Sequence, residues 1–254
     1  MIRKQIDLKL ERAIYDKSYL YFIVFFLLMI AAFWLSYFSK VLNQENYRMH
    51  LHGVALILWC LLLVSQASLI RSKRNALHKQ IGKFSYLLVP IMVITTVELM
   101  TYRIRDHPSL RTMDFYFIAL VLNALIGFLI FYSLAIFNRR NPGIHGRFMI
   151  CTILPMVTAV TDRIIDNYFP RLISYCLTIE GHPIEAVIGF IMVDLFLVGL
   201  CIWDWRSHKR WNVFPFALLV LLIYHYSVLN FYKFQFWESR EKCLNKLKSR
   251  EILC

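Results

Sequence analysis

The sequence His50-Leu-His-Gly53 leads into the apolar run 54–70, which Arg71-Ser-Lys-Arg-Asn-Ala-Leu-His78-Lys-Gln-Ile-Gly82 follows. A helix needs about 20 mostly apolar residues to cross the hydrocarbon core of a bilayer. The pattern therefore predicts two histidines at one membrane face, a transmembrane helix and a basic loop at the other face. A third histidine then begins the next transmembrane helix.

Similar apolar runs recur through the whole chain, in which 59% of the 254 residues are hydrophobic. Backbone groups cannot go unpaired in lipid, so each run that crosses the membrane is expected to be helical. We predict an all-α polytopic membrane protein, a bundle of about seven transmembrane helices. These crossings are expected at 19–38, 54–70, 81–102, 113–137, 148–169, 184–203 and 213–232.

Polar segments flank the predicted membrane domain at both ends of the chain. Near the N-terminus an apolar residue recurs every four positions, at Ile2, Ile6, Leu10 and Ile14. This spacing gives one apolar helical stripe and predicts an amphipathic helix that lies on the membrane surface. The expected organisation is an N-terminal amphipathic cytoplasmic segment, a transmembrane domain and a basic tail, at 1–18, 19–232 and 233–254.

The net charge of +13 comes from 29 Lys and Arg against 16 Asp and Glu. In a membrane protein these cations collect in cytoplasmic loops and against anionic lipid, so the lipid bilayer is the expected partner and nucleic acid is not. The predicted inner segments hold more basic residues than the outer loops, which favours a cytoplasmic N-terminus in a bacterial inner membrane. The basic tail disagrees, because seven crossings would place it outside.

His78 and His145 begin the third and fifth predicted crossings at the same inner face. Two imidazoles that face each other across a gap are the axial ligands that a b-type haem requires. Nearby cations could neutralise haem propionates: Lys79, Lys83, Arg139, Arg140 and Arg147. The alternative is that both histidines cap helix starts or contact lipid headgroups.

A second group of polar residues is expected near the outer face: His50, His52, Glu98 and Asp162, with Arg163 as a charge partner. Ionisable groups inside a bilayer are costly, and they usually pair or serve a pathway. Imidazoles and carboxylates together could hold zinc or another transition metal. They could equally form a proton relay, or an ion-pair network in which Arg163 balances the acids.

Three further polar side chains fall near mid-membrane, at Asn123, Asp194 and His225. Each is expected to bond a neighbouring helix, the commoner role for such groups. The two inner-face histidines are also each followed by a proline deeper in the same crossing, Pro90 and Pro155, where kinks are expected. This parallel is a weak internal repeat.

Residues 45–170 resemble a group of uncharacterised bacterial multi-pass membrane proteins. The first matching run is His52-Gly53, Trp59, Gln66 and Leu77-His78-Lys-Gln-Ile-Gly82. The second is His145-Gly-Arg-Phe-Met-Ile-Cys, Pro155 and Thr161-Asp162-Arg163. This resemblance implies a bacterial membrane location and no established activity.

A more distant likeness is to the ascorbate-reducing transmembrane cytochrome b family. In that family histidines near helix ends ligate two haems, one near each membrane face. His78 and His145 are similar to one such pair by position, whereas the predicted fourth crossing has no histidine to face His52. The likeness therefore implies one haem at most.

Three classes of function remain open from the sequence. The first is a haem- or metal-binding redox protein with a small-molecule or redox partner. The second is a metal-dependent membrane hydrolase, and the third is a non-catalytic sensor, carrier or assembly factor. No phosphate-binding loop, kinase signature or zinc-finger spacing is present, so the sequence specifies neither a reaction nor whether the protein is an enzyme.

Overall fold

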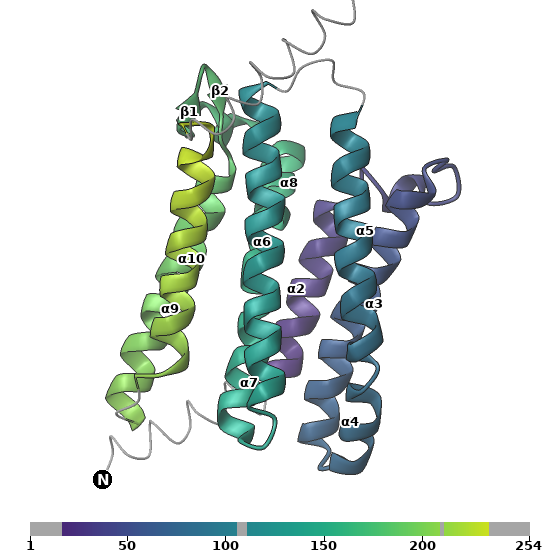
Figure 1. The fold of residues 1–254 in the computed structure, drawn as a ribbon, viewed down its shortest axis with the longest axis vertical. Helices are drawn as coiled ribbons and strands as arrows, with labels where there is room; N and C mark the ends of the chain where they lie inside the picture. The colour runs from purple at the N-terminus through teal and green to yellow at the C-terminus, as the bar shows by residue number, and fades with distance from the viewer. Residues whose placement is uncertain (1–16, 106–110, 209–210, 234–254) are drawn as a thin grey trace, which may run out of the picture.

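The computed structural model describes residues 17–105, 111–208 and 211–233, which form an all-α membrane-type bundle (Figure 1). The helices are α2 (Ser18–Ala32), α3 (Tyr47–Arg71), α4 (Asn75–Gly82), α5 (Ser85–Arg105), α6 (Thr112–Phe137), α7 (Pro142–Cys151), α8 (Leu154–Tyr168), α9 (Ala186–His208) and α10 (Val213–Asn230). Short 3₁₀ segments lie at Phe38–Lys40, Pro170–Tyr175 and Phe231–Lys233. One small antiparallel hairpin pairs β1 (Thr178–Ile179) with β2 (His182–Pro183).

Six helical segments of the described chain are long and apolar enough to cross a membrane: Tyr47–Arg71, Asn75–Arg105, Thr112–Phe137, Pro142–Tyr168, Ala186–Arg206 and Val213–Asn230. Large apolar side chains on these helices point outward, including Ile94 at 64% exposure and Leu195 at 67%. Such a surface suits lipid rather than water. The predicted all-α polytopic bundle is confirmed, and the protein is an integral membrane protein.

The first predicted crossing, 19–38, is shorter as a helix than its apolar run. Helix α2 has 15 residues and ends at Ala32. Side chains near the end of α8 bind its last carbonyl groups, since Asn167 Nδ2 donates to Ala32 O at 2.9 Å and the Tyr168 hydroxyl donates to Ala31 O at 3.0 Å. These bonds compete for the carbonyls that would continue the helix.

Two of the spans are each built from a short helix followed by a longer one. Helix α7 ends at Cys151 and α8 begins at Leu154, with Pro155 in its first turn. A proline ring clashes with the carbonyl four residues earlier, here that of Cys151, which explains this interruption. The break between α4 and α5 falls at residues 83–84, before Pro90, which lies inside α5.

Helix α6 lies in the middle of the bundle and contributes to the two larger apolar clusters (Figure 1). One cluster joins α6 to α7, α8, α9 and α10, and the other joins it to α2, α3 and α5. At Gly127 of α6, an added Cβ would lie 3.3 Å from Pro155 Cγ, so this glycine allows close approach to α8. Helix α2 packs against both α3 and α8.

The two ends of the bundle carry different charges. The cationic end, at the bottom of Figure 1, holds the α3–α4 and α6–α7 connections. It also holds the C-terminal end of α9 and the N-terminal end of α10. Its basic residues include Arg71, Lys73, Arg74, Lys79, Lys83, Arg139 and Arg140. The opposite, acid-rich end carries Glu45, Glu98, Asp114, Asp162, Asp166, Glu180 and Glu185 among its own cations. Nearly all of the predicted interfacial helix and basic tail lies outside the described residues.

Candidate functional site

His78 and His145 meet at the cationic end of the bundle. Each is the fourth residue of a short helix, His78 in α4 and His145 in α7. Their ring centroids are 6.4 Å apart, with the ring planes at 83°. The structure therefore brings together the two histidines that the sequence places on one face, although their helices are far apart in the chain.

The hydrogen bonds of the two rings leave nitrogen atoms available. His145 Nδ1 lies 2.8 Å from Ala135 O. A carbonyl oxygen only accepts, so Nδ1 carries the proton and Nε2 keeps its lone pair. His78 Nδ1 is a buried atom with no hydrogen-bond partner among the described residues. A ligating histidine commonly shows the arrangement of His145, with its other nitrogen held by a backbone carbonyl.

Helix α3 carries two polar side chains whose donors have no partner among the described residues, Gln66 and Trp59. Gln66 lies against Gly82, where an added Cβ would sit 3.3 Å from Gln66 Oε1. Trp59 is fully buried, with its ring 5.8 Å from that of Tyr132, and the Tyr132 hydroxyl lies 2.9 Å from Ser85 Oγ. Trp59 Nε1 and Gln66 Nε2 have no hydrogen-bond partner among the described atoms. Most buried polar groups in folded proteins are hydrogen-bonded, so these two N–H donors are exceptions to the usual pattern.

Arg147 does not serve as a free cation beside the histidines, contrary to the expectation from sequence. Its Nη2 lies 2.9 Å from Asp204 Oδ1, and both side chains are 1% exposed. The pair joins α7 to α9, and the Arg147 guanidinium also lies 5.8 Å from the centre of the Phe214 ring on α10. The cations that remain near the surface here include Arg139, which donates to the Tyr86 hydroxyl at 3.1 Å.

Sequence reasoning missed Asp204 altogether. The sixth crossing was expected to end at residue 203, which left Asp204 in a loop. Helix α9 instead continues to His208, so Asp204 stays helical and faces the bundle. An available signal was the pair of tryptophans on either side of Asp204, because aromatic residues mark the membrane interface rather than the end of a helix.

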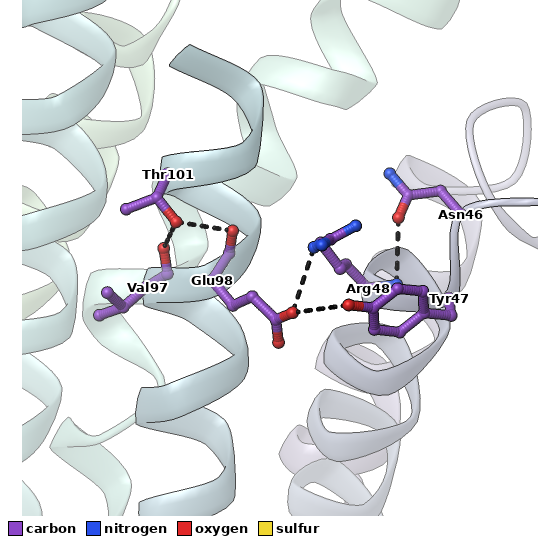
Figure 2. A network of polar contacts seen from close by, with 6 residues as sticks. All are labelled: Asn46, Tyr47, Arg48, Val97, Glu98 and Thr101. Atoms are coloured by element: carbon purple, nitrogen blue, oxygen red, sulfur yellow. Dashed lines mark hydrogen bonds and ion pairs between the residues drawn. The ribbon is translucent and has the colours of Figure 1, made fainter. Parts of the chain in front are cut away.

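At the acid-rich end, Glu98 is already bound by residues from α3 (Figure 2). Its Oε1 lies 3.1 Å from Arg48 Nε and accepts a 3.1 Å hydrogen bond from the Tyr47 hydroxyl. The Arg48 guanidinium also covers the Tyr47 and Tyr102 rings, at 4.5 and 4.7 Å from their centres. Glu98 therefore joins α3 to α5 as an ion pair.

His50 and His52 point to different neighbours, because the chain around them is already helical. His50 Nε2 donates to Gln44 O at 2.9 Å, and the Tyr37 hydroxyl lies 3.3 Å from His50 Nδ1. His52 Nδ1 instead lies 3.4 Å from Thr96 Oγ1 of α5. The two imidazoles do not face a common point.

Asp162 and its predicted partner Arg163 also separate. Asp162 Oδ1 is buried with no hydrogen-bond partner among the described residues, whereas Arg163 Nη1 lies 3.9 Å from Asp166 Oδ2. Among the described residues, no three His, Cys, Asp or Glu side chains are grouped so that they could hold a metal ion. The predicted outer site of His50, His52, Glu98 and Asp162 thus resolves into separate contacts.

The polar groups near mid-membrane bond across helices, as the sequence predicts. Asp194 Oδ2 of α9 lies 3.1 Å from His225 Nδ1 of α10. The His225 ring stacks on Phe190, with centroids 4.0 Å apart. Asn123 Nδ2 of α6 donates to Ser227 Oγ of α10 at 3.2 Å. These contacts join α6, α9 and α10 within the membrane.

No protein-family model, curated protein or solved structure matches this chain. Of the predicted groups, His78 and His145 are the pair that converges with ring nitrogens to spare. The Glu98, His50, His52 and Asp194 side chains are engaged in contacts that hold helices or the 37–44 segment in place.

Proposed function

We propose that this integral membrane protein binds a redox-active metal centre, a b-type haem or a transition-metal ion, between His78 and His145. The observation that supports the proposal is the 6.4 Å separation of the two imidazole centroids at the cationic end. Two metal–nitrogen bonds of about 2.0 Å, with half a ring on each side, span about 6 Å. At this separation both imidazoles would be able to hold one metal.

The number of ligands favours haem over zinc. A structural zinc site takes four protein ligands, and a catalytic one takes three. Haem iron needs only axial ligands from the protein, which two histidines supply. Among the described residues, no three His, Cys, Asp or Glu side chains are grouped so that they could hold a metal ion, and two histidines are the number of ligands that haem takes. Bound iron would supply one-electron transfer.

The surrounding residues would orient and balance such a group. The Ala135 carbonyl holds His145 by Nδ1, so that Nε2 is the nitrogen free to bind. Lys79 and Lys83 beside His78, with Arg139 and Arg140 before α7, would offset the negative charge of propionates. Arg147 is excluded from this role because it is paired with Asp204.

The cellular setting belongs to the same proposal. The excess of basic residues at the end that holds this pair supports a cytoplasmic location for that end, the N-terminus and the histidine pair. The resemblance to bacterial multi-pass membrane proteins supports a bacterial inner membrane. A metal-dependent hydrolase at the outer face gains no support, because Glu98 is bound to Arg48 and Tyr47.

An absorption spectrum with metal analysis tests the proposal. Full-length protein purified in mild detergent should show a Soret band or a stoichiometric transition metal, and His78→Ala and His145→Ala should each lose it. His52→Ala, a histidine on α3 away from the pair, should retain it. A folded wild-type protein that is colourless and metal-free would overturn the proposal. If the alanine variants do not fold, His78→Met should keep the centre with a shifted spectrum, because methionine also ligates haem iron.

A further inference from the structure

A groove of about 270 Å³ lies between α6, α7 and α10 at the cationic end of the bundle. The three helices pack against one another around it. Its apolar wall consists of Leu134, Ile144, Phe148, Val213 and Phe216. Phe148 and Phe216 contact edge to face, with ring centroids 6.3 Å apart. Val213 is buried and Phe216 is exposed, so the groove has a closed floor and an open rim.

The groove changes from polar to apolar with depth in the membrane. Its two amide side chains, Asn138 after the end of α6 and Asn212 before the start of α10, lie at the membrane surface. Trp211, directly before Asn212, is exposed, as tryptophans at the headgroup level are. Leu134 and Phe216 lie four residues deeper on the same two helices, or about 6 Å along each axis. The groove therefore presents amides to lipid headgroups and apolar side chains to acyl chains.

The hydrogen bonds of the two amides determine which groups they offer to a ligand. Asn212 Oδ1 accepts from Val213 N at 2.7 Å, so the NH₂ group of Asn212 is the part that can donate to a ligand. Asn138 Nδ2 donates to Leu134 O at 2.8 Å, so Asn138 Oδ1 is the part that can accept. A donor and an acceptor at the mouth of one groove match the phosphate and the hydroxyl groups of a glycerol headgroup.

The exposed charge around the groove is positive. Arg139 and Arg140 follow the end of α6, Arg206 lies near the end of α9, and all three side chains are exposed. Asp204, the acid that the described residues place at this end, is buried and bound to Arg147. An anion at the mouth of the groove would therefore be near exposed cations and away from every exposed carboxylate of the described chain.

We propose that this groove binds an anionic phospholipid of the leaflet at the cationic end, with phosphatidylglycerol as the matching chemistry. One acyl chain would lie along the apolar wall. The phosphate would accept from the Asn212 amide, and a headgroup hydroxyl would donate to Asn138 Oδ1. Basic pockets between transmembrane helices bind anionic headgroups by such a combination of charge and apolar contact. Neither His78 nor His145 lines the groove, so lipid binding can be tested independently of the metal centre proposed there.

Native mass spectrometry of the full-length protein in mild detergent provides the test, because it counts bound lipids. Phosphatidylglycerol and phosphatidylcholine with the same acyl chains are titrated separately. We expect one phosphatidylglycerol to bind the wild type at concentrations at which phosphatidylcholine does not. Asn212→Asp should weaken this binding about fivefold, because it adds a negative charge beside the phosphate. Aspartate still caps α10, so the variant should fold.

The matched control is Asn46→Asp, which makes the same change at the residue that caps α3 at the acid-rich end, and it should bind phosphatidylglycerol as the wild type does. Leu134→Trp should abolish binding by filling the groove without a change of charge. Its control is Leu195→Trp on α9, at an exposed position outside the groove.

Arg74→Gln separates the groove from the general charge of the cationic end, because it removes a cation from the α3–α4 connection, and it should bind normally. The proposal is overturned if the wild type binds both lipids equally, or if Asn212→Asp binds phosphatidylglycerol as tightly as Asn46→Asp. It is also overturned if Arg74→Gln weakens binding as much as Asn212→Asp, since the lipid would then be held by the cationic end as a whole. If Leu134→Trp does not fold, the comparison of the two Asn→Asp variants decides.

Discussion

The cationic end and the acid-rich end of the bundle use charge in opposite ways. At the cationic end most basic residues face outward, and the Arg147–Asp204 ion pair is almost completely buried, with 1% exposure of each side chain. At the acid-rich end the pairs Arg48–Glu98 and Arg163–Asp166 are 26–43% exposed. Asp162, also at that end, has a buried Oδ1 atom without a hydrogen-bond partner among the described residues.

This difference distinguishes the charged groups that fix helix packing from the groups that contribute little to it. A charge pair that is fully buried fixes how helices pack, because removing one partner leaves the other uncompensated in a low-dielectric interior. An exposed pair contributes little, since water and salt screen it. The buried atoms without a hydrogen-bond partner among the described residues, His78 Nδ1 and Asp162 Oδ1, therefore belong to residues outside these ion pairs.

The largest expected effect is at the cationic end. Asp204→Ala should cost about 3–5 kcal/mol of unfolding free energy, because it leaves the Arg147 guanidinium buried without its carboxylate. Denaturation of the purified protein measures this loss. Replacing both residues together, Arg147→Met with Asp204→Leu, should be less damaging than Asp204→Ala. A single variant as stable as the wild type would show that the pair is not a structural element.

The next effect concerns packing at the acid-rich end. Gly53→Ala should destabilise the protein by about 1–3 kcal/mol, because the new Cβ would lie 2.8 Å from the Tyr37 ring. The matched control is Gly199→Ala in α9, where nothing lies within 4 Å of the added atom. Its Tm should equal or exceed that of the wild type. Equal losses in both variants would argue against the close contact with Tyr37.

A smaller, pH-dependent effect is expected from Glu185→Gln. Burial, with a further contribution from Asp166, raises the pKa of Glu185 in the folded protein. Below the ordinary glutamate pKa of about 4.3, both folded and unfolded chains hold the proton. As pH rises from there through the raised pKa, the folded chain resists ionisation and wild-type stability falls.

The glutamine variant lacks this penalty, so its Tm should exceed that of the wild type by a margin that grows with pH. Melting curves of both proteins across a pH series give the margin. A margin that is constant or shrinks with rising pH would contradict the raised pKa.

The smallest effect is expected from Glu98→Gln. The Arg48–Glu98 pair is partly exposed, so its loss should cost about 1 kcal/mol or less, and the glutamine can still accept from the Tyr47 hydroxyl. The difference from wild type should shrink further at high salt. A loss as large as that of Asp204→Ala would remove the distinction between the two ends.

Some of the site contacts were predictable from the sequence because they depend on helix geometry. Placing His78 and His145 on one membrane face required only alternate crossings, and the structure brings the two rings together. The expectation that Asp194, His225 and Asn123 bond neighbouring helices is also confirmed. Lipid makes an isolated polar group so unfavourable that a partner on an adjacent helix follows from the sequence.

The outer site was predicted less well, because shared depth in a membrane does not bring side chains together. Glu98 and Asp162 were expected at the same face, but Glu98 binds Arg48 and Tyr47 of α3, whereas the buried Oδ1 of Asp162 has no hydrogen-bond partner among the described residues. Which side chains of a helix contact each neighbouring helix depends on the rotation of every helix about its own axis. Asp204 escaped notice for a related reason, since α9 extends beyond its apolar run.

The sequence alone determined that the chain enters a membrane as helices, because long apolar segments must satisfy their backbone groups internally. It also determined the two faces at which polar residues emerge, since these follow from the rise of 1.5 Å per residue along each crossing. Only the tertiary structure decided which polar residues become partners. That choice depends on helix rotation and on close approaches such as Gly189 against Thr158, which arise from packing among segments distant in the chain.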